Sequence, residues 1–287
     1  DVFMANDICA PHHRAKAMDR YVPPGLQRLC EDHGVCISSC LNYWEDELVL
    51  QAFNRNLILA PEIYGSPWLL SDKEFARLAR IFNVHRKYND ILVNGMQLSD
   101  QVYGPVSVAC GDRSTRLLAL RNLTWEPVKR KVMLSSTIGL VEKGTTGMVD
   151  VRLIFPYEKY IGAVKYGLEV EVEVLPFRSC LLLVTTKPEE NFYLWGCNYE
   201  VMRDMPGKPV SVKVYGMPGE NISFRLEGQR KFTKATLDGK AVPELLSGRF
   251  ATAAFEGTAY KNNYHRRLGA MKPAPVPADA EALARDA

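Results

Sequence analysis

The sequence predicts an α/β segment followed by antiparallel β structure. Within the first 60 residues, three short apolar runs each end at polar or aromatic residues and lead into a helical stretch. That repetition is typical of βα units in a parallel sheet. From about residue 103, alternating apolar and polar residues between turn signals indicate strands instead. We interpret the chain as the last βα units of a TIM (β/α)8 barrel followed by antiparallel β-sandwich domains.

Four segments follow from this pattern. We expect residues 1–100 to be the carboxy-terminal part of a barrel, and residues 101–188 to be a β-sandwich domain. A second β-rich domain is expected over 189–270, and a linker or tail rich in Pro and Ala over 271–287. The chain begins inside an apolar run and without Met, so we expect a fragment or a processed product of a longer protein.

The composition is that of an ordinary soluble domain. Apolar residues make up 47%, charged residues 24%, and the net charge is +3. Lys and Arg are scattered among Asp and Glu, so no nucleic-acid partner is expected. Because no apolar run reaches the ~20 residues of a membrane span, no membrane partner is expected either.

The seven cysteines form no metal-binding pattern that we recognise. The spacing of Cys30, Cys36 and Cys40 matches no familiar zinc site, so we expect reduced or incidental thiols, no metal and no cofactor. Two cellular locations are compatible with the sequence. A periplasmic or secreted location is favoured for a bacterial polysaccharide-degrading enzyme, and a cytoplasmic location is the alternative.

The candidate site lies where the predicted parallel strands end. The three strands are Val2–Ala5, Val35–Ser39 and Leu57–Ala60. Active sites of such folds lie at the carboxyl ends of the strands. The polar and aromatic residues at those ends are Asp7, His12, His13, Asn42, Tyr43, Trp44, Glu62, Tyr64 and Trp68.

A long helix is predicted from Ser71 to about Tyr88. Ser71 and Glu74 have the spacing of a capping box. One apolar face follows at helical spacing and should be buried on the outside of the barrel as its last layer. The residues of this face are Phe75, Leu78, Ala79, Phe82 and His85.

The strands predicted beyond residue 103 follow one another at short intervals. Glu169, Glu171 and Glu173 alternate with valines, which indicates one solvated and one buried face. Asp238-Gly239 is a hairpin turn signal. The predicted strands are 106–110, 116–122, 129–134, 149–155, 168–175, 180–185, 210–215, 222–226, 235–237 and 250–255.

Two stretches resemble the retaining α-galactosidases of glycoside hydrolase family 36, in clan D. The first is Asp7 followed by the segment Arg14–Gln27, which contains Tyr21-Val-Pro-Pro24. The second is Leu57–Leu98, which contains Ala60-Pro-Glu-Ile-Tyr-Gly65 and resembles the last barrel strand and helix of that family. The resemblance covers roughly residues 1 to 140 and implies a hydrolase that acts on α-linked carbohydrate without a cofactor.

The resemblance implies that Asp7 is the general acid/base. A retaining glycosidase needs two carboxyl groups about 5 Å apart. In the family the nucleophilic Asp follows the fourth barrel strand, which this chain does not contain if its first strand is the sixth. The family's Asp-Asp pair is here Asn6-Asp7, and its upstream Arg is absent. The plainer alternative is that Asp7 caps the following helix or turn.

The other candidate residues have two interpretations each. Glu62 is the rival carboxylate, which could bind a sugar hydroxyl, act as the acid/base, or make a structural hydrogen bond. His12 and His13 could bind hydroxyls or lie solvated in a loop. The remaining candidates for substrate binding, by hydrogen bonds or by stacking on a pyranose, are equally compatible with ordinary packing: Asn42, Tyr43, Trp44 and Tyr64.

A function from another class competes with hydrolysis. In that alternative the chain is a non-catalytic carbohydrate-binding or structural module, with a degenerate barrel remnant and a β-sandwich that binds. In both readings the expected partner is a carbohydrate. The remaining part of the same protein, or a second copy of the chain, is a further candidate partner.

Overall fold

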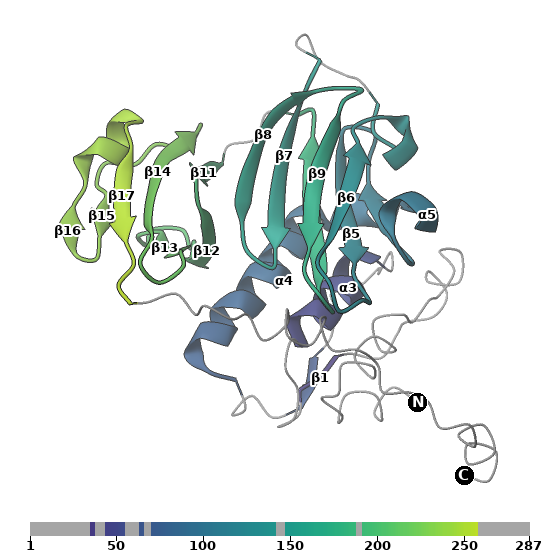
Figure 1. Ribbon diagram of the computed structural model, residues 1–287, viewed down its shortest axis with the longest axis horizontal. Coiled ribbons are helices and arrows are strands. Elements are labelled where there is room, and N and C mark those ends of the chain that lie inside the picture. Colours follow the sequence, from purple (N-terminus) through teal and green to yellow (C-terminus); the bar gives the residue numbers. More distant parts are fainter. Residues whose placement is uncertain are drawn as a thin grey trace.

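The structure, a computed structural model, describes residues 35–37, 44–54, 63–65, 70–141, 147–187 and 191–257. These residues form mostly antiparallel β-sheets with few helices (Figure 1). None of the helices in these ranges is long and apolar enough to cross a membrane.

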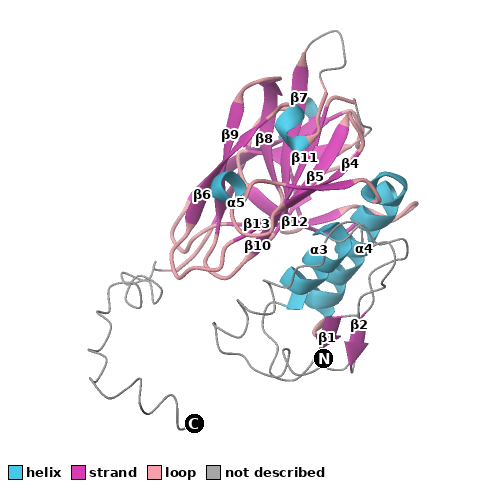
Figure 2. Cartoon of the chain, turned by 90° about the vertical axis from the view of Figure 1, so that its right-hand side faces the viewer, coloured by secondary structure: helices cyan, strands magenta, loops and turns pink. Residues whose placement is uncertain are grey.

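The first described elements form a small parallel unit. Strands β1 (Val35–Ile37) and β2 (Ile63–Gly65) pair in parallel, and helix α3 (Trp44–Asn54) lies between them in the chain. Parallel strands need such a crossover connection. Helix α3 contacts β1 on one side and the main sheet on the other, and Figure 2 shows α3 and α4 side by side between these layers.

A six-stranded antiparallel sheet forms the centre of the molecule, in the order β3-β4-β5-β10-β7-β8. Its two middle strands, β5 and β10, are buried on both faces almost throughout. Four of its strands lie within one or two residues of the predicted ranges, whereas β3 and β8 were not predicted. The strands are β3 (Gly95–Gln97), β4 (Val108–Gly111), β5 (Thr115–Arg121), β7 (Met148–Phe155), β8 (Lys159–Lys165) and β10 (Ser179–Thr185).

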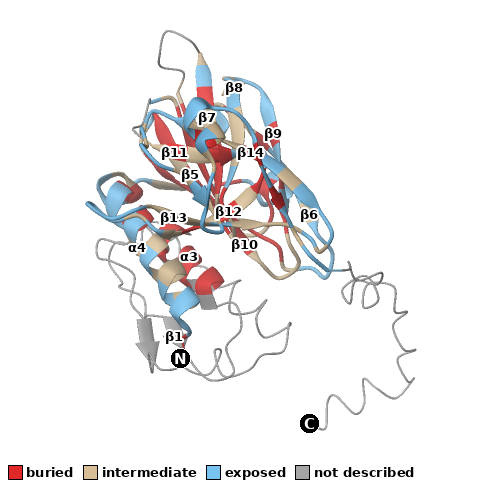
Figure 3. Cartoon of the chain, turned by 90° about the vertical axis from the view of Figure 1, so that its left-hand side faces the viewer, coloured by how far each residue is buried: buried red, intermediate tan, exposed pale blue. Residues whose placement is uncertain are grey.

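Each face of this sheet is covered by a different layer. Helices α3 and α4 pack on one face, and their side chains share a core with Leu117, Leu181 and Leu183. The antiparallel pair β6 (Val128–Met133) and β9 (Glu169–Val174) covers the other face. The glutamates of β9 are exposed and its valines buried, as its alternating sequence predicted (Figure 3). The short helices α5 (Asp100–Tyr103) and η3 (Ser136–Ile138) border this layer.

Helix α3 is fixed to the sheet by a buried carboxylate. The Asp46 side chain has no solvent exposure, and its Oδ1 accepts hydrogen bonds from the backbone N–H (2.6 Å) and hydroxyl (3.1 Å) of Ser179. Arg178 Nε lies 2.9 Å from Asp46 Oδ2. A buried charge is tolerated when it is paired and hydrogen-bonded in this way, so Asp46 ties α3 to the first residue of β10.

Helix α4 (Asp72–Leu92) begins as predicted and ends four residues later than predicted. The backbone N–H of Ser71 donates to Glu74 Oε2 at 2.8 Å, the hydrogen bond that a capping box requires. The predicted buried face was partly wrong, because Phe75 and Ala79 are exposed. The helix packs on α3 and on the sheet, so it turns its more carboxy-terminal apolar residues inward. Its buried residues are Ile81, Val84, His85, Tyr88 and Leu92.

A third unit is built from smaller sheets with its own core. The predicted turn at Asp238-Gly239 is confirmed, since both residues have positive φ, 49° and 81°. Strands β11 and β12 were not predicted. The elements are β11 (Phe192–Trp195), β12 (Asn198–Arg203), β13 (Ser211–Tyr215), β14 (Asn221–Gly228), β15 (Thr236–Leu237), β16 (Lys240–Ala241), η4 (Pro243–Ser247) and β17 (Ala251–Ala254).

Truncation of a central leucine should destabilise the sheet strongly. Leu118 lies in β5 with no exposure, so Leu118→Ala removes buried methyl groups and leaves a cavity. We expect a loss of about 2–5 kcal/mol in the free energy of unfolding, measured by urea denaturation. The exposed Leu168 provides the control, because Leu168→Ala should change stability by less than about 0.5 kcal/mol. Equal effects of the two substitutions would contradict the buried position of Leu118.

His85 should make stability depend on pH. His85 lies on the buried side of α4, against Phe53 of α3. This burial lowers the pKa of His85 below its ordinary value of about 6.5. Below that value the unfolded chain binds a proton that the folded chain excludes, so stability falls as the pH falls. We expect the unfolding temperature to drop less between pH 7 and pH 5 in His85→Leu than in the wild type. The other histidines are the same in both proteins, so identical pH profiles would contradict this role.

Candidate functional site

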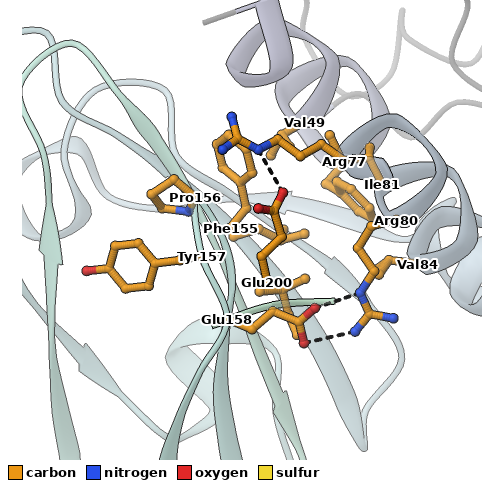
Figure 4. A pocket seen from close by; sticks show the side chains of 13 residues that line it. Val49, Arg77, Arg80, Ile81, Val84, Phe155, Pro156, Tyr157, Glu158 and Glu200 are labelled. Carbon is orange, nitrogen blue, oxygen red and sulfur yellow. Dashed lines mark hydrogen bonds and ion pairs between the residues drawn. The ribbon is translucent and has the colours of Figure 1, made fainter. Parts of the chain in front are cut away.

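A cluster of ion pairs lies where helix α4, the main sheet and the third unit meet. Arg77 and Arg80 lie three residues apart on α4 and point toward carboxylates of other elements (Figure 4). We call this cluster the arginine joint. It comprises Arg77, Arg80, Glu45 of α3, Glu158 from the turn between β7 and β8, Glu200 of β12 and Tyr215 of β13.

The pair of Arg80 and Glu158 has bidentate geometry. Arg80 Nε and Nη2 donate to the two carboxylate oxygens of Glu158 at 2.7 and 2.9 Å. Burial opposes the charged form of Arg80, but the charge and hydrogen bonds of Glu158 outweigh it and raise the pKa of the guanidinium. Glu158 also exchanges two backbone hydrogen bonds with Tyr199 at 2.7 and 3.0 Å, so the pair joins the main sheet to the third unit.

Arg77 connects two carboxylates from opposite sides of the joint. Its Nε donates to Glu200 at 2.7 Å, and its Nη1 donates to Glu45 at 2.8 Å. The Tyr215 hydroxyl donates to the second oxygen of Glu200. Burial again opposes the charge, and the hydrogen bond and charge of Glu200 outweigh it, so the pKa of Arg77 is raised. Helices α3 and α4 are thereby linked to β12 and β13.

A small apolar cavity lies beside these ion pairs. It is lined by side chains of both helices and of the sheet, among them Val49, Ile81 and Phe155 (Figure 4). Its volume is about 30 Å³, which is room for about two water molecules. Small-molecule sites usually enclose ~300 Å³ or more, so this cavity does not hold a sugar ring.

The arginine joint is therefore suited to structural linkage rather than to acid–base catalysis. Both oxygens of Glu158 and both oxygens of Glu200 accept hydrogen bonds from the protein. Neither carboxylate presents an oxygen to a substrate. A general acid must reach the leaving-group oxygen in a plausible substrate pose, and both carboxylates are instead held by protein donors.

A larger cavity, about 610 Å³, lies within the third unit. Apolar side chains such as Phe192, Val212 and Phe224 line much of it, together with Lys231 and Lys234. Phe192 and Phe224 also belong to the core of this unit. The hydroxyl-bearing residues Thr233 and Thr236 complete the polar part of the lining.

The described ranges contain no group of three or more His, Cys, Asp or Glu side chains that could hold a metal ion. Cys110, Cys180 and Cys197 are buried there. Burial raises the pKa of Cys180 and of Cys197 to about 12 in each case. The thiols of Cys180 and Cys197 are therefore not in the reactive thiolate form near neutral pH.

Most of the predicted site residues lie outside the described residues, namely Asp7, His12, His13, Asn42, Tyr43, Glu62 and Trp68, as does the predicted strand Leu57–Ala60. Trp44 is the first residue of α3, close to its predicted place before a helix. Tyr64 was expected in a loop beyond a strand, and this was wrong, because it pairs with Cys36 inside β2. The partners of Arg77 and Arg80 were not predicted, since nothing local in the sequence joins α4 to residues 158 and 200.

Comparison with known proteins gives partial likenesses. No protein-family model matches the chain, and no curated protein matches it in sequence. Among solved structures, a protein from Bacillus halodurans C-125 proposed to be an α-N-acetylgalactosaminidase is 15% identical over 50% of this chain and 30% of its own, with a TM-score of 0.39. The α-galactosidase I of Mortierella vinacea is 12% identical over 50% of this chain and 36% of its own, with a TM-score of 0.37.

A third likeness is to a variant of a GH27 β-L-arabinopyranosidase from Geobacillus stearothermophilus. It is 16% identical over 49% of this chain and 29% of its own, with a TM-score of 0.33. All three are named as glycoside hydrolases, and the chain spans about a third of their length. Each TM-score lies below 0.5, so these likenesses define neither the fold nor the activity of this chain.

Disruption of one partner in the arginine joint should cost more than removal of both. Arg80→Met leaves Glu158 buried without its guanidinium, and we expect a loss of about 2–4 kcal/mol in the free energy of unfolding. The double variant Arg80→Met, Glu158→Met should recover most of that loss, because both charges are gone. Urea denaturation of the two single variants and the double variant measures the coupling.

The exposed pair of Lys129 and Glu171, 2.8 Å apart, is the matched control. Lys129→Met should leave stability unchanged within error, because exposed ion pairs contribute little. Strictly additive effects of Arg80→Met and Glu158→Met would show that the joint does not act as a pair.

Proposed function

We propose that this chain is part of a glycoside hydrolase of the α-galactosidase type, similar to the retaining enzymes of family 36 and clan D. Its substrate would be an α-linked carbohydrate. The proposal rests on the resemblance of residues 1 to 140 to those enzymes and on one feature of the structure.

That feature is the parallel pair β1 and β2 with α3 between them, followed directly by α4 and an antiparallel sheet. A strand, a helix and a second parallel strand form the repeating unit of a β/α barrel. Helices α3 and α4 cover one face of the antiparallel sheet, the arrangement expected where the outer helices of a barrel meet a trailing β-sandwich. It supports the proposal that the chain contains the last βα units of a barrel.

The proposed chemistry uses two carboxyl groups. A nucleophilic carboxylate, which we propose is supplied by a segment not among these 287 residues, attacks the anomeric carbon while Asp7 protonates the departing glycosidic oxygen. Asp7 then takes a proton from water, whose oxygen attacks the same carbon and releases the nucleophile. Glu62 is the rival for the acid/base role. We propose His12, His13, Asn42, Tyr43, Trp44 and Tyr64 as substrate-binding residues.

The competing function is a non-catalytic module that binds carbohydrate. One observation favours it: the carboxylates Glu158 and Glu200 of the arginine joint are fully engaged by protein donors. Under this alternative the complete protein binds sugar polymers and hydrolyses none of them.

Asp7→Asn in the complete protein that contains this sequence should abolish most turnover. General acid–base groups contribute roughly 100- to 10,000-fold, so we expect kcat on an unactivated α-galactoside to fall by about that range. With a nitrophenyl leaving group the first step needs little protonation. A burst of nitrophenol equal to the enzyme concentration should then precede a slow steady state.

Glu62→Gln is the comparison variant. It should raise KM with a smaller change in kcat if Glu62 binds a hydroxyl. Full activity of Asp7→Asn together with a burst in Glu62→Gln would transfer the acid/base role to Glu62. If the complete wild-type protein hydrolyses neither α-galactosides nor other α-glycosides, the hydrolase proposal is wrong.

A further inference from the structure

The outer face of the third unit's main sheet carries an exposed row of aromatic and charged side chains. The sheet has the order β11-β14-β17, and its strands lie together at one end of the molecule (Figure 1). Alternate residues such as Leu194, Phe224 and Ala253 point into the core. Their neighbours point outward, because successive side chains of a strand lie on opposite faces.

Three of these outward residues form one line across the strands. Trp195 of β11 lies directly opposite Arg225 of β14. On the other side of β14, Phe224 is opposite Ala251, so the same register places Phe250 opposite Arg225, one residue before β17 begins. We call Trp195, Arg225 and Phe250 the aromatic row. It runs perpendicular to the strands.

The side chains of the aromatic row are in mutual contact. The guanidinium carbon of Arg225 lies 4.8 Å from the ring centroid of Trp195 and 5.3 Å from that of Phe250. The two ring centroids are 5.8 Å apart with an interplanar angle of 71°. Arg225 Nε also donates to Glu227. These contacts hold the rings in place, so little side-chain entropy is lost when a ligand packs on them.

The rings nevertheless remain open to solvent. Trp195 is 39% exposed and Phe250 is 46% exposed. Polar side chains of the same outer face flank them, since Glu227 lies on one side and the hydroxyls of Ser223 and Thr252, 3.1 Å apart, lie on the other. The Arg225 side chain donates to Glu227 through Nε and is itself 36% exposed, so its guanidinium is accessible from this surface.

We propose that the aromatic row binds the pyranose rings of a carbohydrate chain. A pyranose offers an apolar face of C–H groups and a rim of hydroxyls. The fixed aromatic surface matches the C–H face, while guanidinium donors, the Glu227 carboxylate and the hydroxyls of Ser223 and Thr252 match the rim. This site shares a ligand class with the proposed hydrolase but none of its residues.

The charge balance of the row favours a neutral sugar over a nucleic acid. Single-stranded nucleic acids also stack on aromatic rings, but their binding sites carry an excess of positive charge. Here the charge of Arg225 is compensated by Glu227, which forms an ion pair with it on the same face. A phosphate backbone would meet that carboxylate, whereas a sugar hydroxyl can donate to it.

Affinity electrophoresis in gels that contain galactomannan or dextran tests the proposal. The wild-type chain should be retarded by at least one of these two polymers. Trp195→Ala and Phe250→Ala should each weaken retardation about tenfold or more, which corresponds to about 1.4 kcal/mol. Arg225→Met, which keeps an apolar side chain but loses the N–H donors, should weaken it as well.

Trp125→Ala is the matched control. Trp125 is 48% exposed and packs edge-on against Phe177 at 4.8 Å, but it lies in the loop between β5 and β6, away from the aromatic row. It should leave retardation unchanged. Circular dichroism of every variant confirms that the fold is kept.

Three results would overturn the proposal. They are the absence of retardation of the folded wild type by both polymers, equal losses in Trp125→Ala and Trp195→Ala, and tight binding of oligodeoxythymidylate that Trp195→Ala abolishes. The hydrolase proposal and the proposal for the aromatic row can be refuted independently of each other. Asp7→Asn in the complete protein should bind the polymer normally, and Trp195→Ala should hydrolyse a small aryl glycoside at the wild-type rate.

Discussion

The need to bury both faces of strands β5 and β10 governs the architecture of the described residues. These strands are buried almost residue by residue, and they pair with each other in the middle of a six-stranded sheet. An antiparallel sheet can leave one face in water, but this one cannot, because Leu117 faces the helices and Leu118 faces the opposite layer. Helices α3 and α4 therefore cover one side and β6 with β9 covers the other.

The position of α4 on the sheet in turn decides where the third unit attaches. Its buried residues Ile81, Val84 and Tyr88 pack in the core. Arg77 and Arg80 therefore lie at the border with β12. The carboxylates that meet them come from three different elements. Guanidinium and carboxylate groups that are paired in this way make a specific contact and have no oxygen left for catalysis. The aromatic row of the third unit, by contrast, is exposed to solvent.

Local sequence patterns predicted individual strands and turns better than they predicted contacts. The alternation of Glu and Val in β9 and the turn at Asp238-Gly239 are encoded within a few residues, and both were predicted. Strand β8 was missed because its burial is intermediate on most residues and gives no clear alternation. The inward face of α4 depends on the sheet beneath it, and the partners of Arg77 and Arg80 lie far away in the chain.

Of the predicted site, Trp44 and Tyr64 lie in described elements, and the roles of Asp7 and Glu62 remain predictions. The aromatic row could have been found only from the register of β11, β14 and β17, which the sequence alone does not specify.

The buried carboxylate of Asp46 has a consequence for synthesis on the ribosome. Its hydrogen-bond donor, Ser179, is 133 residues further along the chain, and at about 5–20 residues per second that segment takes roughly 7 to 27 s to be made. During that interval the apolar side of α3, with Leu48, Val49 and Phe53, has no β10 to cover it. The nascent segment that contains α3 should therefore be a binding site for molecular chaperones until β10 has been made.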